Sequence, residues 1–275
     1  MTERHIVAGS AGLIDAGRNQ HQARLGPVMR HALSLSGAPR PKLCWMGTAH
    51  GDSMLGLRAF YGATSGEPIE ASHLQLFTMP NVDPERHLLA QDVIWVGGGS
   101  VVNLLAVWRA HGVDAILRRA WEQGVVLGGI SAGAICWHLG GNTDSFGPAL
   151  QPVTDALGLL PFSTCVHYDG EPARRPHYHS LIADGTLPAG YATDDGVAIH
   201  YRGTEVAEAI SQTPGALAHR VFKSASGGVV EEPLAPRLLP SCRAPGSGDR
   251  ASYSAWRSTG CLAAVASSRR RTGVV

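Results

Sequence analysis

The sequence predicts an α/β fold in which a mostly parallel sheet is flanked by helices. Short apolar runs rich in β-branched residues alternate with longer segments of helical periodicity. Of the 275 residues, 44% are hydrophobic and 16% are charged, which is enough apolar material for a full-sized core. In the second half of the chain the apolar runs follow one another closely, and this spacing predicts short antiparallel strands there.

The first half supplies five predicted strands and four predicted helices. The strands are expected at residues 5–8, 42–46, 73–78, 92–96 and 125–128. The helices are expected at residues 17–35, 52–63, 101–110 and 112–123. Such alternation is typical of parallel strands connected by crossover helices.

In the second half of the chain the predicted strands follow one another more closely. Its strands are expected at residues 164–168, 197–201, 205–210 and 216–222, and a helix is expected at residues 172–184. Arg202-Gly203-Thr204 predicts the turn of a hairpin. These elements extend the same α/β domain with antiparallel strands.

The composition predicts one domain over residues 1–235 and a tail over residues 236–275. Ser, Arg, Gly and Pro dominate the tail, which carries seven Arg and one Asp, a net charge of +6, and leaves the domain at −5. A mildly acidic domain argues against nucleic-acid binding. For the tail three interpretations stay open: a disordered or non-native extension, a segment that binds an acidic partner, or one that binds a membrane surface.

Neither a membrane span nor a cysteine-based site is expected. No apolar run reaches about 18 residues, and the N-terminal residues do not resemble a secretory signal, which predicts a cytoplasmic protein that does not bind membranes. The five cysteines are scattered without paired spacing, which argues against a disulfide framework or a structural zinc site. Cys44 and Cys136 are expected to pack as small apolar groups.

The most informative motif is G-x-S-x-G at residues 129–133, between an apolar strand and an apolar helix. This context is typical of a nucleophile elbow, in which a serine projects from a tight strand-to-helix turn. Ser131 is therefore the candidate nucleophile. The amide of Ala132, at the start of the helix, is a candidate oxyanion donor. The alternative is a helix-capping serine among closely packed small residues.

A second glycine cluster, Gly97-Gly98-Gly99, also follows a predicted strand and precedes a helix. Adjacent parallel strands end at the same edge of a sheet, so the two loops are expected to face each other. Gly99 is then the candidate for the second oxyanion donor. A phosphate-binding loop is the alternative, but neither the dinucleotide nor the P-loop spacing is present.

Four segments together resemble the peptidase E (aspartyl dipeptidase) family, serine exopeptidases related in fold to class I glutamine amidotransferases and to cyanophycinase. They are Val96-Gly97-Gly98-Gly99, Gly129-Ile130-Ser131-Ala132-Gly133-Ala134, Cys165-Val166-His167-Tyr168 and Asp194-Asp195-Gly196. The resemblance covers roughly residues 4–232 and implies a class I glutamine amidotransferase-like sheet. It also implies a small peptide as substrate and no cofactor.

The resemblance implies a catalytic triad of Ser131, His167 and Asp195, with Gly99 and Ala132 as the oxyanion hole. Serine chemistry needs an imidazole to accept the hydroxyl proton and a carboxylate to fix the tautomer of that imidazole. Well-known members carry Glu where this chain has Asp195, so the shorter side chain requires a small backbone adjustment. Asp194 is the alternative acid.

Recognition of an N-terminal aspartate requires a cation, ideally a bidentate arginine. Arg174 and Arg175, downstream of His167, are the candidates. Ser100 is the third candidate substrate contact, because family members commonly have Asn after the glycine run. His177 and His179 are not expected to hold a metal, since alternate residues of one helix rarely both bind one ion.

Three alternatives to an aspartyl dipeptidase stay open. One is cyanophycinase-like cleavage of a β-aspartyl bond by the same mechanism. Another is an α/β-hydrolase-type esterase, with Ser131 and Asp195 followed by a later histidine, His200 or His219. The last is a catalytically inactive binding module. The sequence leaves the oligomeric state open, a homodimer included.

Overall fold

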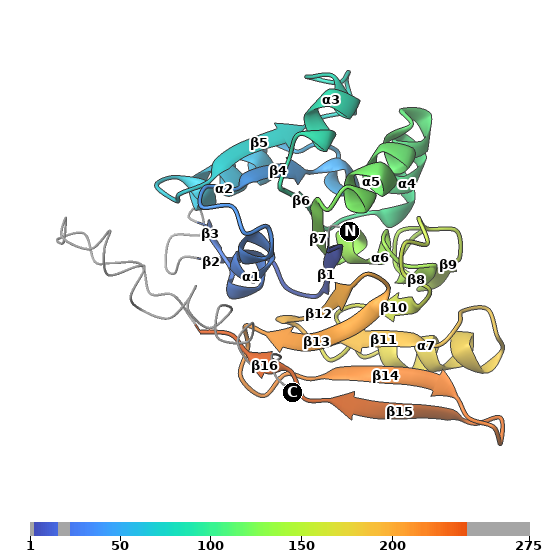
Figure 1. The fold of residues 1–275 in the computed structure, drawn as a ribbon. Coiled ribbons are helices and arrows are strands. Elements are labelled where there is room, and N and C mark those ends of the chain that lie inside the picture. Colours follow the sequence, from blue (N-terminus) through green and yellow to red (C-terminus); the bar gives the residue numbers. More distant parts are fainter. Residues whose placement is uncertain (1–2, 16–22, 241–275) are drawn as a thin grey trace, which may run out of the picture. The chain divides into compact units, whose positions relative to one another are not determined.

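The computed structural model describes residues 3–15 and 23–240 (Figure 1). The chain divides into two units, Met1–Leu239 and Pro240–Val275, and the description below concerns the first. Its strands form two large sheets and a two-stranded ribbon of β2 (Leu13–Asp15) and β3 (Ala23–Leu25).

The larger sheet has eight strands. In order across the sheet these are β16 (Arg237–Leu238), β13 (Glu205–Ser211), β12 (Val197–Arg202), β1 (His5–Gly9), β7 (Val126–Ile130), β6 (Val93–Val96), β4 (Lys42–Met46) and β5 (Glu70–Leu74). From β1 to β5 all neighbours are parallel, whereas β12 is antiparallel to both β1 and β13. The predicted mostly parallel α/β sheet is confirmed.

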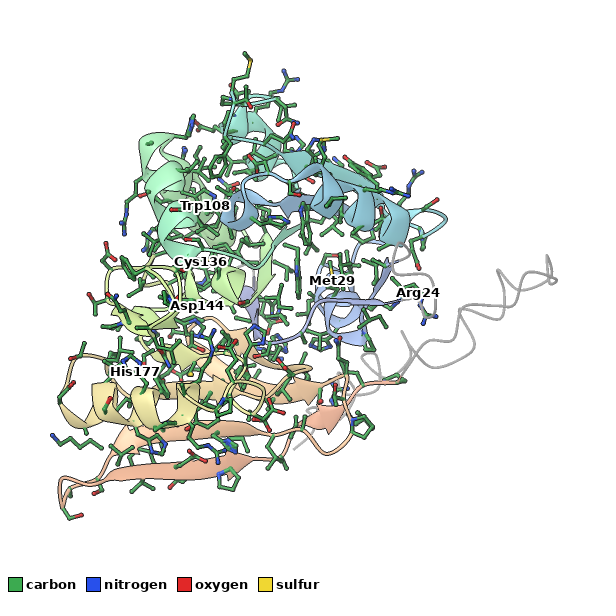
Figure 2. The ribbon with its side chains drawn as sticks, turned by 180° about the vertical axis from the view of Figure 1, so that it is seen from behind. Arg24, Met29, Trp108, Cys136, Asp144 and His177 are labelled. Atoms are coloured by element: carbon green, nitrogen blue, oxygen red, sulfur yellow. The ribbon has the colours of Figure 1, made fainter. Side chains whose placement is uncertain are left out.

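Helices cover both faces of this sheet, because alternate residues of each strand point to opposite sides. These helices are α1 (Pro27–Leu35), α2 (Met54–Thr64), α3 (Pro84–Leu89), α4 (Val101–Ala110), α5 (Val113–Glu122), α6 (Ala132–Ile135) and the short 3-10 helix η1 (Thr48–His50), whereas α7 (Arg174–Ala183) belongs to the second sheet. Ile6 of β1 packs in the same core cluster as Trp108 of α4, and Val7 packs in the cluster that contains Met29 of α1. Trp108 and Met29 mark the two faces in Figure 2.

The second sheet has six strands and is built from the second half of the chain. Its order is β15 (Val229–Leu234), β14 (Ala218–Lys223), β11 (Gly190–Thr193), β10 (Ser163–Cys165), β8 (Gly140–Thr143) and β9 (Gln151–Val153). Helix α7 packs on it through Tyr178, Leu181 and Ile182. The prediction of antiparallel strands in this half is confirmed, but they extend two sheets rather than one.

Three predicted elements differ from the structure for local reasons. The strand predicted at residues 164–168 is β10 and ends at Cys165, because His167 has a φ of 54° and cannot continue it. The helix predicted at residues 17–35 begins only at Pro27, whose fixed φ suits the first helical turn, and residues 23–25 form β3 instead. Residues 16–22 of that prediction lie outside the described residues. The strand predicted at residues 73–78 is β5, Glu70–Leu74. It ends early because Asp52 Oδ2 accepts hydrogen bonds from the N–H groups of Leu76 and Phe77, at 2.5 and 3.0 Å.

The folded unit extends slightly beyond the predicted boundary at residue 235. Arg237 and Leu238 pair in parallel with Ile210 and Ser211, so these residues belong to the sheet. The predicted tail from residue 241 onward lies outside the described residues, as do Cys242 and Cys261. Cys44 and Cys136 are buried and unpaired, as predicted. Among the described residues no helix is long and apolar enough to span a membrane, and the cytoplasmic location stays a prediction.

The buried His138, which follows α6, is expected to couple the stability of the fold to pH. Burial lowers the pKa of His138 from 6.5 to about 4. Its ring nitrogens lie 2.8 Å from the Ala134 carbonyl oxygen and 3.1 Å from the Tyr201 hydroxyl. Between these two pKa values His138 binds a proton in the unfolded chain but not in the folded chain. The free energy of unfolding therefore decreases as the pH falls through this window.

We expect the free energy of unfolding to decrease between about pH 7 and pH 5, with a shallower pH dependence in His138→Gln. Urea unfolding at a series of pH values measures both slopes. The matched control is His111→Gln, which changes an exposed histidine at the end of α4 and should keep the wild-type slope. Equal slopes for His138→Gln and the wild type would contradict the assignment.

Candidate active site

Ser131 lies at the turn between β7 and α6, with a φ of 57° and a ψ of −119°. Positive φ is uncommon outside glycine and stores backbone strain. The flanking glycines make the turn sterically feasible. A Cβ on Gly129 would lie 2.1 Å from the carbonyl oxygen of Gly133, and a Cβ on Gly133 would lie 2.3 Å from that of Val96. The predicted elbow geometry is therefore present at Ser131.

The two glycine loops lie together at the carboxyl edge of the parallel strands. A Cβ on Gly98 would lie 3.2 Å from Ser131 Cβ and 3.7 Å from its Oγ, so Gly98 lies beside the serine. Gly99 has a φ of 132° and approaches the Ala49 carbonyl too closely for any side chain. Within the described part of the chain, neither Gly99 N–H nor Ala132 N–H donates a hydrogen bond. Both donors are thus available to an oxyanion.

His167 and Asp195 are brought together by two neighbouring strands of the second sheet. Cys165 at the end of β10 pairs in parallel with Ala192 of β11, so the segments that follow the two strands run side by side. His167 Nδ1 donates to Asp195 Oδ1 at 2.5 Å. This bond directs Nε2, the other ring nitrogen, away from the carboxylate. The His167 side chain is 24% exposed and that of Asp195 is 56% exposed, so the pair opens to solvent.

The loop after His167 wraps around Asp195. Asp169 Oδ1 accepts a hydrogen bond from Asp195 N–H at 2.8 Å. A Cβ on Gly170 would lie 2.7 Å from Asp195 Oδ2, so a glycine leaves room for the carboxylate. His167 itself has a φ of 54°. Among the described non-glycine residues, only Asp52, Ser131 and His167 have a positive φ.

Asp194, the alternative acid, occupies a different environment. It is buried, and its Oδ2 accepts a hydrogen bond from Leu217 N–H at 2.9 Å. Burial raises the pKa of Asp194, and the nearby Asp169 carboxylate adds to this effect. Among the described residues Asp195, not Asp194, is the hydrogen-bond partner of His167.

The end of β1 joins all three segments of the site. The Gly9 carbonyl accepts a hydrogen bond from Ser131 N–H at 3.0 Å. The next residue, the buried Ser10, accepts from His167 N–H through its Oγ at 2.9 Å, and its Oγ donates to the Thr193 carbonyl at 2.9 Å. The Ser10 carbonyl accepts from Gly196 N–H at 2.9 Å. The sequence analysis assigned Ser10 no role, although its place directly after the first strand was a signal.

The connection between Ser131 and His167 is made through β1 and not by a direct side-chain contact. Among the described residues, Ser131 Oγ has no hydrogen-bond partner, His167 included. In apo structures catalytic hydrogen bonds are often long and tighten only in the substrate complex. The end of β1 therefore holds the backbones of both Ser131 and His167.

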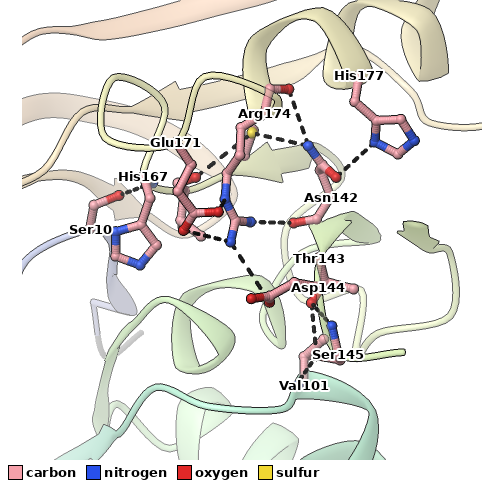
Figure 3. A network of polar contacts seen from close by, with 12 residues as sticks. Ser10, Val101, Asn142, Thr143, Asp144, Ser145, His167, Glu171, Arg174 and His177 are labelled. Atoms are coloured by element: carbon pink, nitrogen blue, oxygen red, sulfur yellow. Dashed lines mark hydrogen bonds and ion pairs between the residues drawn. The ribbon is translucent and has the colours of Figure 1, made fainter. Parts of the chain in front are cut away.

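Arg174 is buried in a network that fastens the loop after His167 (Figure 3). Its Nε and Nη2 donate to the Glu171 carboxylate at 2.7 and 3.0 Å, and Nη1 donates to the Asn142 carbonyl at 3.1 Å. Asp144 adds an ion pair at 3.7 Å. All three guanidinium nitrogens have acceptors within the protein, so Arg174 fastens this loop to the second sheet. A substrate contact by Arg174 stays a prediction.

The same network reaches α4, which follows the glycine run. Asp144 is succeeded by Ser145, whose Oγ accepts a hydrogen bond from Val101 N–H at 2.9 Å, as Figure 3 shows. Ser100, the N-cap of α4, accepts from Asn103 N–H at 3.2 Å. A substrate contact by Ser100 stays a prediction.

The remaining basic residues of α7 point to separate partners. Arg175 forms an ion pair with Glu231 at 3.3 Å and lies over the Tyr168 ring, 4.6 Å from its centroid, while its side chain stays 48% exposed. His177 hydrogen-bonds to Asn142 and His179 to Glu231, so the two histidines do not converge. A substrate contact by Arg175 stays a prediction.

Comparison with known proteins agrees with this geometry. The sequence model of peptidase family S51 matches residues 11–209. The chain belongs to peptidase family S51. An uncharacterized peptidase, YgaJ of Bacillus subtilis (strain 168), is 44% identical over 210 residues, which cover 76% of this chain and 90% of the relative. Peptidase E of Shewanella denitrificans (strain OS217) is 30% identical over 130 residues, 44% of this chain and 55% of the relative.

Solved structures share the fold of this S51 peptidase. A peptidase from an acI-B1 Actinobacterium superposes with a TM-score of 0.63 at 14% identity, covering 87% of this chain and 97% of the other. A protein described as a candidate peptidase E from Listeria monocytogenes EGD-e superposes with a TM-score of 0.53 at 18% identity. The match covers 77% of this chain and 100% of that protein. The predicted peptidase E assignment and its fold are confirmed.

Ser10→Ala tests whether the end of β1 positions His167. The change leaves His167 N–H without its acceptor, so we expect the imidazole to shift and kcat for peptide hydrolysis to fall roughly 10- to 100-fold, with KM nearly unchanged. Steady-state kinetics separates the two constants. The matched control is Ser72→Ala on the edge strand β5, whose hydroxyl contacts Leu43 and Gln91, and it should keep the wild-type kcat. A Ser10→Ala enzyme with wild-type kcat would refute the positioning role.

Proposed function

We propose that this S51 peptidase is a serine exopeptidase that removes an N-terminal aspartate from dipeptides or short peptides. The observation that carries the proposal is the 2.5 Å hydrogen bond between His167 Nδ1 and Asp195, at the strand end that also holds Ser131. The strained turn at Ser131 and the free N–H groups of Gly99 and Ala132 support it.

The proposed reaction follows from these positions. His167 Nε2 takes the Ser131 proton as Oγ attacks the scissile carbonyl carbon, and Asp195 stabilises the imidazolium that forms. The negative charge on the carbonyl oxygen is met by Gly99 N–H and Ala132 N–H. The imidazolium then gives its proton to the leaving amine as the C–N bond breaks. Water, deprotonated by His167, hydrolyses the acyl-enzyme and frees Ser131.

The triad predicts a steep loss of activity when each member is replaced. Ser131→Ala should abolish both peptide hydrolysis and labelling by a fluorophosphonate probe, because the probe reacts only with an activated serine. Asp195→Asn should lower kcat by about 10³- to 10⁴-fold, because the amide disfavours the required His167 tautomer. Kinetics and probe labelling measure these effects.

Two neighbouring substitutions serve as controls for the triad assignment. Asp194→Asn keeps an acceptor for Leu217 N–H and should retain most activity. His219→Gln tests the esterase alternative and should leave hydrolysis intact, because Asp195 pairs with His167. Loss of activity in His219→Gln, or a wild type that the probe does not label, would favour the esterase or the binding module, respectively.

The aspartyl preference is supported by family resemblance and by one exposed cation. Arg175, with a half-exposed guanidinium stacked on Tyr168, is the candidate partner for the substrate carboxylate. A planar guanidinium binds a carboxylate bidentately. Cyanophycinase-like cleavage of a β-aspartyl bond uses the same machinery and differs only in how the substrate is bound.

A small substrate panel separates these specificities. Among Asp-Leu, β-Asp-Arg, Leu-Leu and a simple ester, we expect Asp-Leu to have the highest kcat/KM, because only an N-terminal aspartate presents its side-chain carboxylate to the cation. Arg175→Gln should raise KM for Asp-Leu and leave Leu-Leu unchanged. A clear preference for Leu-Leu would overturn the aspartyl assignment, and a preference for β-Asp-Arg would indicate the cyanophycinase-like activity.

A further inference from the structure

A cluster of two histidines and a glutamate lies beside the middle of β1, away from Ser10. His31 on α1, His200 on β12 and Glu208 on β13 converge there, with side chains that are 7%, 4% and 31% exposed. Val7 pairs with His200 across the strands, which places the cluster roughly 10 Å along β1 from Ser10. The triad does not use these residues.

The three candidate ligand atoms have the spacing of a metal site. His31 Nε2 lies 3.3 Å from His200 Nδ1 and 3.9 Å from Glu208 Oε1, and the third distance, between His200 Nδ1 and Glu208 Oε1, is 3.8 Å. A triangle with these sides has a circumradius of about 2.1 Å, so one point lies about 2.1 Å from all three atoms. Zinc bonds to histidine nitrogen and carboxylate oxygen are roughly 2.0–2.2 Å long.

The surrounding residues orient the ligands in the way a metal requires. His5 Nδ1 lies 3.0 Å from His200 Nε2, and His5 Nε2 lies 3.4 Å from the Glu3 carboxylate. With His5 donating to Glu3, its Nδ1 accepts the His200 Nε2 proton, which leaves the lone pair of His200 Nδ1 directed to the centre. A ligating histidine characteristically donates its second N–H in this manner.

An arginine also contacts the carboxylate of this cluster. Arg237 donates two hydrogen bonds of 2.8 Å to Glu208 and holds the carboxylate in place. Its positive charge also opposes a second cation, so we expect a moderate affinity rather than a tight one.

We propose that His31, His200 and Glu208 form a structural site for Zn²⁺, separate from the catalytic machinery. The site ties α1 to β12 and β13 on the same face of the large sheet. The sequence analysis expected no metal and did not consider these residues, because His31 is far in sequence from His200 and Glu208 and the three show none of the short spacings typical of zinc motifs.

The test uses the full-length, untagged protein, stripped with a chelator and then titrated with Zn²⁺. Calorimetry should show one Zn²⁺ per chain, and the metal should raise the thermal unfolding midpoint. His31→Gln should abolish both effects, and His5→Gln should weaken binding about 10- to 100-fold. His111→Gln, at the exposed end of α4, should bind like the wild type. Absence of stoichiometric binding, or binding that survives His31→Gln, overturns the proposal.

A second pair of measurements does not depend on the folding of a histidine variant. Co²⁺ added to the wild type should give the intense visible absorption of a low-symmetry nitrogen and oxygen site, and Zn²⁺ should displace it. Arg237→Gln, which changes a half-exposed residue, should tighten Zn²⁺ binding severalfold by removing the opposing charge. If the cluster is only a hydrogen-bonded histidine chain, neither the wild type nor Arg237→Gln takes up one Co²⁺ or Zn²⁺ per chain, and the proposal fails.

Discussion

The structure depends on how the first strand ends. The Gly9 carbonyl and the Ser10 hydroxyl and carbonyl hold the backbones of Ser131, His167 and Gly196 within hydrogen-bond distance of two consecutive residues. The two carbonyl groups are well suited to this task, because their geometry is fixed by strand pairing, and the Ser10 hydroxyl is held by its own bond to the Thr193 carbonyl. The end of β1 therefore positions the proposed nucleophile, base and acid relative to one another, although these residues come from widely separated parts of the chain.

This arrangement arises because each of the two sheets supplies a different part of the site. Ser131 stands at the carboxyl end of β7 in the large sheet, where parallel strands leave their loops at one edge. His167 follows β10 of the second sheet, and Asp195 lies in the turn that leads from β11 of the second sheet into β12 of the large one. Gly196 completes that turn with a φ of 88°, in a space where a Cβ would collide with Thr213. The site is thus assembled where the chain crosses between the sheets.

The contrast between what the sequence predicted and what it missed has a physical reason. The turn at Ser131 was predictable, because a strand, two glycines and a helix are all local in sequence. The role of Ser10 was not, since one hydroxyl after a strand becomes informative only when long-range pairing places His167 above it. Arg174 looked available for a substrate carboxylate, and only the packing of α7 against β8 shows its guanidinium occupied by Glu171 and Asn142. The histidine cluster was hidden for the same reason, because His31 lies far in sequence from the hairpin that carries His200 and Glu208.

The loop from His167 to Arg174 positions Asp195, the proposed acid, against His167. Asp169 binds the Asp195 amide, and the absence of a side chain at Gly170 leaves space for the carboxylate. Glu171 is then fixed by the buried Arg174, whose own position is set by the second sheet. The 2.5 Å contact between His167 and Asp195 is therefore framed by a loop that Arg174 and Glu171 fasten to the second sheet.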